Sequence, residues 1–226
     1  MSEPRTLLVF AHRDEASAFA DVPHLVTGVG KVNAAVSLAS ALAAGDVERV
    51  VVLGTAGVVG DGPDRPHLDE VYQITGVVQH DFSLPSPELR PAGAAILPPE
   101  STVVLATGDV FVKNDAQRAH IAGLGAALVD MEAYAYASVC ERFEVPLQLF
   151  KIPSDFADSS TTDEEWDTIV FRKSEQLREF WATRLAGSSG AGDAGSAAAA
   201  DTGDAAAAAD TVGGGAAAAG VSGARP

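Results

Sequence analysis

The stretch RVVVLGTAG, from Arg49 to Gly57, decides the fold class of this chain. Its apolar residues follow one another without alternating polar ones, which is typical of a strand buried on both faces. Outward from it lie five similar runs: TLLVFA, HLVTGV, VYQITGVVQ, TVVLAT and LQLFKI. Helical patterns separate these runs, and KVNAAVSLASALAAG ends at Gly45, a residue common at helix C-caps. Strands that alternate with helices predict an α/β fold with a mainly parallel sheet.

Composition limits the classes of function. The chain has 226 residues, enough for one substantial domain. Its formal net charge of −16 should repel phosphate backbones and anionic lipid surfaces, so we expect neither nucleic acid nor a membrane as partner. No apolar run has the length of a membrane span, and the N-terminus lacks the pattern of a signal peptide. The single cysteine, Cys140, cannot form an internal disulfide, which fits a reducing cytoplasm.

The composition changes abruptly near Gly187. Residues 187–226 are almost entirely Ala and Gly with scattered Asp and Ser, and they contain no large apolar residue apart from isolated valines. Such a segment buries too little surface to offset its ordering entropy. We therefore expect a folded domain over residues 1–186 and a disordered tail over 187–226.

Small, polar or acidic residues follow five of the predicted strands, in the segments AHRDEA, GVGK, GTAG, TGDVFV and PSDFAD. Ligands of open α/β sheets gather at the carboxyl ends of the strands, so these segments are candidate parts of a site. Gly28-Val29-Gly30 lacks the third glycine of a dinucleotide fingerprint, and no P-loop occurs. Taken alone, GTAG indicates a tight turn between a strand and a helix.

Three carboxylates are candidate functional groups: Glu15, Glu132 and Asp155. We expect LVDMEAYAYASVC, from Leu128 to Cys140, to be one helix that carries Glu132 on its apolar face and Asp130 on a solvated face. A buried charge costs several kcal/mol unless it is paired, so Glu132 needs a partner. Glu15 alone could be a solvated acid near a helix start, and Asp155 alone a turn or N-cap residue. A last helix is predicted over 161–185, where TTDEE has the spacing of a capping box.

Taken together, these segments resemble the nucleoside phosphorylase/nucleosidase superfamily, and within it the methylthioadenosine/S-adenosylhomocysteine nucleosidases. The resemblance covers roughly residues 6–180. VTGVGKVNAAVSLASAL is similar to the family's GxGKxxAA segment, GTAG to its Ser-Ala-Gly turn, and TGDVFV to its GDxF segment. DMEAYAYASVC and PSDFAD are similar to its MEAxAxAxxC helix and its SDxAD loop. The resemblance implies a three-layer α/β/α sandwich around a mainly parallel, partly mixed sheet, and a homodimer.

The resemblance also implies roles for particular residues in binding a nucleoside. Glu132 would accept hydrogen bonds from sugar hydroxyls, which makes the ligand the partner of its charge, and Met131 would pack against the sugar. Phe111 would stack on the purine, and the backbone of Val112 would pair with its edge. Thr55 stands where the family usually has serine.

Two further acids would carry the chemistry that the resemblance implies. Asp155, positioned by Ser154, would protonate the departing base, and Glu15 would take a proton from the attacking water. Such an acid and base need separated pKa values, which differing burial can provide. Neither a metal nor an organic cofactor is required. The expected reaction is hydrolysis of the N-glycosidic bond of 5′-methylthioadenosine, S-adenosylhomocysteine or a similar 5′-substituted adenosine.

Two alternatives stay open. A phosphorylase of the same superfamily would need cations around a phosphate dianion, and Arg13 is the only cation in the first loop. A non-catalytic nucleoside-binding protein on the same fold would need Glu132 and Phe111 but not both Glu15 and Asp155. The sequence also departs from the family pattern at His12, where methionine is usual, at Val58, and at Lys151, where arginine is frequent. These departures leave the 5′-substituent open.

Overall fold

The computed structural model describes residues 5–159 and 163–186. Its strands are β1 (Thr6–Phe10), β2 (Leu25–Val26), β3 (Arg49–Val58), β4 (Tyr72–Gln79), β5 (Thr102–Thr107), β6 (Leu128–Asp130) and β7 (Leu147–Asp155). Its α-helices are α1 (Lys31–Ala44), α2 (Asp115–Ala122), α3 (Ala133–Phe143) and α4 (Asp163–Phe180), with short helical turns at Ser17–Phe19, Pro99–Ser101 and Trp181–Leu185. Within this part of the chain, no helix is both long and apolar enough to cross a bilayer.

The strands form one mixed sheet in the order β2-β1-β3-β6-β5-β4-β7. Most neighbours are parallel, whereas the pairs β3–β6 and β4–β7 are antiparallel. This confirms the prediction of an α/β fold with a partly mixed sheet. Strand β7 also pairs with β3, so β3, β6, β5, β4 and β7 close into a ring from which β1 and β2 extend. The sequence patterns did not predict this closure.

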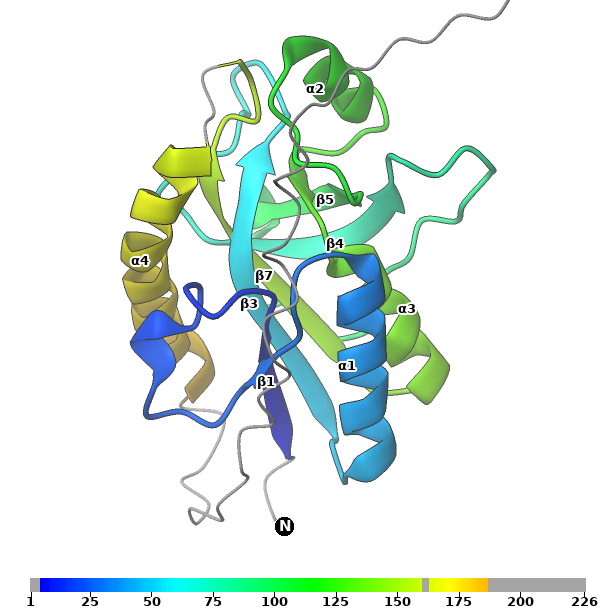
Figure 1. The fold of residues 1–226 in the computed structure, drawn as a ribbon, viewed down its shortest axis with the longest axis vertical. Helices are drawn as coiled ribbons and strands as arrows, with labels where there is room; N and C mark the ends of the chain where they lie inside the picture. The colour runs from blue at the N-terminus through cyan, green and yellow to red at the C-terminus, as the bar shows by residue number, and fades with distance from the viewer. Residues whose placement is uncertain (1–4, 160–162, 187–226) are drawn as a thin grey trace, which may run out of the picture. The chain divides into compact units, whose positions relative to one another are not determined.

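Helices cover the sheet on two faces (Figure 1). On one face α1 and α3 pack against each other and against the sheet, burying side chains such as Leu38 and Tyr136. On the other face α4 packs against β3, β7 and the turn Ser17–Phe19, with Leu177 and Trp181 in the core. The apolar residues of β3 face both cores, which explains why that run does not alternate with polar residues.

The predicted helix over 128–140 is wrong at its beginning. Leu128, Val129 and Asp130 form β6, which pairs with β5 and β3, and the helix begins only at Ala133. The Asp130 carboxylate accepts hydrogen bonds from the backbone N–H of Ala133 and of Glu132, so it caps the helix from three residues before the first helical residue. Asp130 is therefore buried, not solvated as predicted.

The GTAG segment is not a turn. It lies inside β3, which continues to Val58 with a shift in register opposite β7 between Ala56 and Gly57. A Cβ at Gly57 would lie 2.9 Å from the Cβ of Ala157, so the glycine lets the loop after β7 approach the strand. Gly45 is the C-cap residue of α1, as predicted. The proposed capping box at 161–162 and the tail from 187 lie outside the described residues.

Candidate active site

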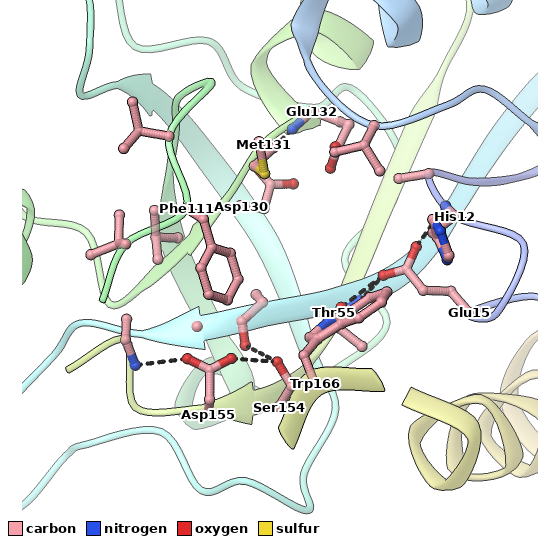
Figure 2. Close-up of a pocket in the computed structure, with 18 of the residues that line it drawn as sticks. His12, Glu15, Thr55, Phe111, Asp130, Met131, Glu132, Ser154, Asp155 and Trp166 are labelled. Carbon is pink, nitrogen blue, oxygen red and sulfur yellow. Dashed lines mark hydrogen bonds between the residues drawn. The ribbon is translucent and has the colours of Figure 1, made fainter. Parts of the chain in front are cut away.

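A cavity of about 300 Å³ opens beside the carboxyl ends of β1, β3 and β7, a size suited to a small molecule (Figure 2). Seven segments supply its lining: the loop after β1, the loop before α1, the second half of β3, the loop before α2, the junction of β6 and α3, the end of β7, and the start of α4. The eight site residues that the sequence analysis proposed all line it: Glu15, Thr55, Phe111, Val112, Met131, Glu132, Ser154 and Asp155.

Glu15 is buried and its carboxylate accepts three hydrogen bonds. The backbone N–H of Thr55 lies 2.6 Å and its hydroxyl 2.8 Å from Oε1, and the N–H of His12 lies 3.1 Å from Oε2. A Cβ at Gly54 would lie 3.1 Å from Oε1, so only glycine there leaves the carboxylate this close to β3. The side chain is thereby held in one orientation, and within the described part of the chain only the N–H of His12 donates to Oε2.

Aromatic side chains stand next to Glu15. The indole Nε1 of Trp166 donates to Thr55 Oγ1 at 3.2 Å, so Thr55 connects α4 to the carboxylate. The ring of His12 meets Trp166 edge to face, with centroids 5.2 Å apart. Both rings line the cavity, and the sequence analysis assigned no role to Trp166. Its only signal was an aromatic residue within the acidic run TTDEEWD.

Asp155 is the last residue of β7, and both oxygens of its carboxylate accept hydrogen bonds. Ser154 donates its hydroxyl to Oδ2 at 2.7 Å, and the backbone N–H of Ala157 donates to Oδ1 at 2.8 Å. Ala157 has a φ of 49°, so a left-handed residue turns the loop back toward the carboxylate. Figure 2 shows Asp155 and Glu15 at separate places in the cavity, with the ring of Phe111 near Asp155.

Glu132 lies at the N-cap position of α3 and is 4% exposed. Its Oε1 accepts a hydrogen bond from the backbone N–H of Gly30 at 2.8 Å. The chain itself therefore supplies one of the hydrogen bonds that a buried carboxylate requires. Burial and the neighbouring Asp130 raise the pKa of Glu132 to about 8. A carboxyl of this kind can change its protonation state when a ligand enters.

A buried ion pair lies close to Glu15 and Glu132. Lys151 of β7 is 1% exposed, and its Nζ lies 2.9 Å from Asp130 Oδ2. Burial alone would lower the pKa of Lys151, but Asp130, Glu15 and Glu132 together raise it above its ordinary value. The hydroxyl of Thr107 also donates to Asp130, at 2.8 Å. The sequence analysis missed the part played by Asp130, because the packing of β6 rather than any local pattern buries it.

A polar cluster on the surface holds the loop that carries Phe111 and Val112. Asp109 accepts from the backbone N–H of Lys31 at 2.8 Å, and Asp81 accepts from the N–H of Asp109 and from Lys31 Nζ. The start of α1 and the loop before α2 are thus tied together beside the cavity. Among the described residues, no group of three or more His, Cys, Asp or Glu side chains is arranged to hold a metal ion.

The amino-acid sequence of this chain is similar to sequences of known proteins. The sequence profile of the phosphorylase superfamily matches residues 92–185. A 5′-methylthioadenosine/S-adenosylhomocysteine nucleosidase of Marinomonas sp. (strain MWYL1) is 30% identical over 184 residues, which cover 70% of this chain and 78% of that protein. The chain belongs to the phosphorylase superfamily. The resemblance drawn from the sequence motifs is therefore confirmed.

Solved structures of this superfamily share the fold. Futalosine hydrolase of Helicobacter pylori strain 26695 superposes with a TM-score of 0.71 at 17% identity, covering 81% of this chain and 98% of that one. The 5′-methylthioadenosine/S-adenosylhomocysteine nucleosidase of H. pylori, solved with butyl-thio-DADMe-Immucillin-A, gives 0.71 at 18% identity, covering 82% and 99%. Membership of the superfamily and the α/β fold are thus established, whereas the substrate is a separate question.

Proposed function

We propose that this protein hydrolyses the N-glycosidic bond of a purine nucleoside and releases the free base. The observation that carries the proposal is the placement of two carboxylates, Glu15 and Asp155, at separate positions of one cavity that also holds Phe111 and Glu132 (Figure 2). A general acid and a general base on opposite sides of a scissile bond are what hydrolysis of a glycosidic bond requires.

The proposed mechanism assigns each group one task. The purine stacks on Phe111 with its five-membered ring toward Asp155, and Glu132 accepts hydrogen bonds from the ribose hydroxyls. Protonated Asp155 gives its proton to the base nitrogen as the bond from that nitrogen to C1′ breaks. Water adds to C1′ and loses a proton to ionised Glu15, so the products are the free base and a free sugar.

The names of the relatives and the residues of the cavity support a proposal for the substrate class. Relatives named as methylthioadenosine/S-adenosylhomocysteine nucleosidases and a futalosine hydrolase share the fold. We propose 5′-methylthioadenosine, S-adenosylhomocysteine or a similar 5′-substituted adenosine as substrate. The 5′-substituent would lie toward His12 and Trp166, which line the cavity beside Glu15.

A phosphorylase is less well supported. Phosphorolysis needs cationic side chains around a phosphate dianion. Among the described residues that line the cavity, none is Lys or Arg. Lys151 lies behind the wall, where it is 1% exposed and paired with Asp130. A protein that only bound nucleosides would have no use for two carboxylates held as Glu15 and Asp155 are.

The test is a panel of nucleosides incubated in phosphate-free buffer, with chromatographic detection of free base and sugar. We expect free adenine and a free 5-substituted ribose, at a rate that added phosphate does not change. Asp155→Asn should lower kcat at least about 100-fold, because general acid catalysis contributes typically 10²–10⁴-fold. Glu15→Gln should be similarly severe. Turnover only with phosphate, with ribose 1-phosphate as product, would support the phosphorylase instead.

We also propose that the protein is a homodimer. Five exposed apolar residues lie on α1 or beside its start, and we call them the apolar rim: Val29, Val32, Val36, Phe82 and Val110. Lys31 bonds to both Asp81 and Asp109, which precede Phe82 and Val110 in the chain and so bring these two residues to the start of α1. Val32 is 72% and Val36 62% exposed, which is unusual for successive turns of one helix face. The rim continues into the cavity through Val29 and Val110.

Sedimentation equilibrium tests the dimer. The intact chain should have twice its sequence mass, and Val32→Asp should shift it to the monomer, because a charge would be buried in the contact. Phe171→Asp, on the exposed face of α4, is the matched control and should stay dimeric. A monomeric wild-type chain at micromolar concentration would contradict the proposal.

A further inference from the structure

We propose that α4 orients Glu15 for the activation of water, through the hydroxyl of Ser174 and the indole N–H of Trp166. The inference rests on the proposed hydrolysis, in which Glu15 is the base. Ser174 would be a positioning residue, since it does not line the cavity. Trp166 lines the cavity and would act on Glu15 through Thr55.

Ser174 holds the backbone of the Glu15 loop. Its hydroxyl donates to the main-chain oxygen of Glu15 at 2.7 Å and accepts from the backbone N–H of Ala18 at 3.0 Å. Both partners lie in the segment after β1, and Ser174 itself is fully buried. A hydroxyl can donate and accept at once, so one side chain closes this turn from both ends. Alanine at this position would remove both of these hydrogen bonds.

Trp166 supports the hydrogen bond from Thr55 to Glu15. The hydroxyl of Thr55 has a single hydrogen, and Nε1 of Trp166 donates to its oxygen at 3.2 Å. The incoming N–H uses a lone pair of this oxygen, and the hydroxyl donates its hydrogen to Glu15 Oε1, 2.8 Å away. The two bonds together hold the hydroxyl in one place. With Oε1 saturated by the N–H and the hydroxyl of Thr55, Oε2 is the oxygen that faces fewer protein donors. This arrangement favours Oε2 as the acceptor of the water proton.

The helix that carries both groups is firmly anchored. Val170 and Leu177 are fully buried. Lys173 is also buried, and its Nζ donates to the main-chain oxygen of Leu68 and to Asp69 Oδ1. A helix fixed on the sheet can therefore hold Glu15 in place at both its backbone and its carboxylate. Misplacement of a reacting group by about 1 Å can cost ~100-fold in rate.

Two single variants test the idea. Ser174→Ala should lower kcat for base release roughly tenfold, the effect of partly misplacing the base, while KM stays within about twofold. Trp166→Phe keeps an aromatic ring but removes the N–H, and it should also lower kcat. The matched control is Thr183→Ala. The hydroxyl of Thr183 donates to the carbonyl groups of Glu179 and Phe180, within the same helical segment. This substitution should leave kcat unchanged. A wild-type kcat in Ser174→Ala would overturn the proposal.

A double-mutant cycle separates positioning from a general loss of structure. If Ser174 acts through Glu15, Ser174→Ala should have no further effect on kcat in the Glu15→Gln background. An equal loss in both backgrounds would show that Ser174 only supports the fold, and would overturn the proposal. A wild-type rate in Glu15→Gln alone would instead reject Glu15 as the base, and with it the proposed function. The three outcomes are therefore distinguishable.

Discussion

At the scale of single residues, the site depends on how each carboxyl is buried and what it meets. Glu132 accepts one backbone hydrogen bond from Gly30, which is too little to balance its desolvation and the proximity of Asp130. Its pKa is raised to about 8, far from the ordinary value of 4.5. Glu132 therefore keeps its proton near neutral pH and can both donate and accept a hydrogen bond.

This raised pKa predicts a pH-dependent stability difference. Between about pH 4.5 and 8 the unfolded chain ionises Glu132 while the folded chain keeps its proton, so Glu132 makes the wild type lose stability as pH rises through this window. Glu132→Gln removes that loss. Its free energy of unfolding relative to wild type, measured with urea, should increase by about 1 kcal/mol or more from pH 5 to pH 8. The control is Glu141→Gln, at an exposed position. If the free energy of unfolding relative to wild type were as independent of pH for Glu132→Gln as for this control, the prediction would be contradicted.

At the scale of elements, one ion pair joins β7 to the junction of β6 and α3. Lys151 comes from β7 and Asp130 from the last residue of β6, and both side chains are almost completely buried. Gly54 of β3 lies between them and Glu15, since a Cβ there would lie 3.1 Å from Lys151 Nζ. Strands β3, β6 and β7 therefore meet at this ion pair, and Glu15 lies beside it across Gly54.

Breaking this contact should destabilise the fold strongly. Lys151→Met leaves Asp130 buried without its cation, which typically costs about 3–5 kcal/mol. The free energy of unfolding from urea titration measures the loss. The exposed pair Arg5–Asp46 provides the control, because Arg5→Met should cost at most about 1 kcal/mol. Adding Asp130→Asn to Lys151→Met should recover part of the stability, and a further loss would contradict this account.

At the scale of the whole molecule, closure of the sheet brings distant segments to one cavity. Strand β7 pairs with both β3 and β4, which closes the ring and places the ends of β3, β6 and β7 together. Residues as far apart in the chain as Glu15 and Trp166 line the same space as a result. The last helical residues that the structure describes belong to the core, because Trp181 and Leu185 pack on the face of the sheet that α4 covers.

The Ala/Gly-rich segment should be dispensable. Truncation after Gly187 keeps Trp181 and Leu185, the last large apolar residues that the core buries. We expect the Tm to change by less than about 2 °C and kcat/KM to be unaffected, because the removed composition cannot bury a core. Differential scanning calorimetry and the base-release assay measure both. A fall of many degrees would show that the segment packs on the domain.

Much of this protein can be predicted from the sequence. Continuous apolar runs such as VVVL in β3 require burial on both faces, and this sufficed to predict the class of fold and six of the strands. Motifs such as GDVF and PSDFAD were enough to indicate the superfamily. They work because local residue order determines which groups follow the end of a strand.

Other features were decided only by tertiary structure. VDMEAYAYA has a helical pattern throughout, yet its first residues form β6 because the edges of β5 and β3 offer hydrogen bonds that outweigh local propensity. The local sequence predicts that Asp130 is solvated, but the pairing of β6 buries it beside Lys151. Ser174 and Trp166 meet the Glu15 region only when α4 packs on the sheet. Contacts between residues more than 100 positions apart leave no trace in local pattern, because they depend on which surfaces the closed sheet brings together.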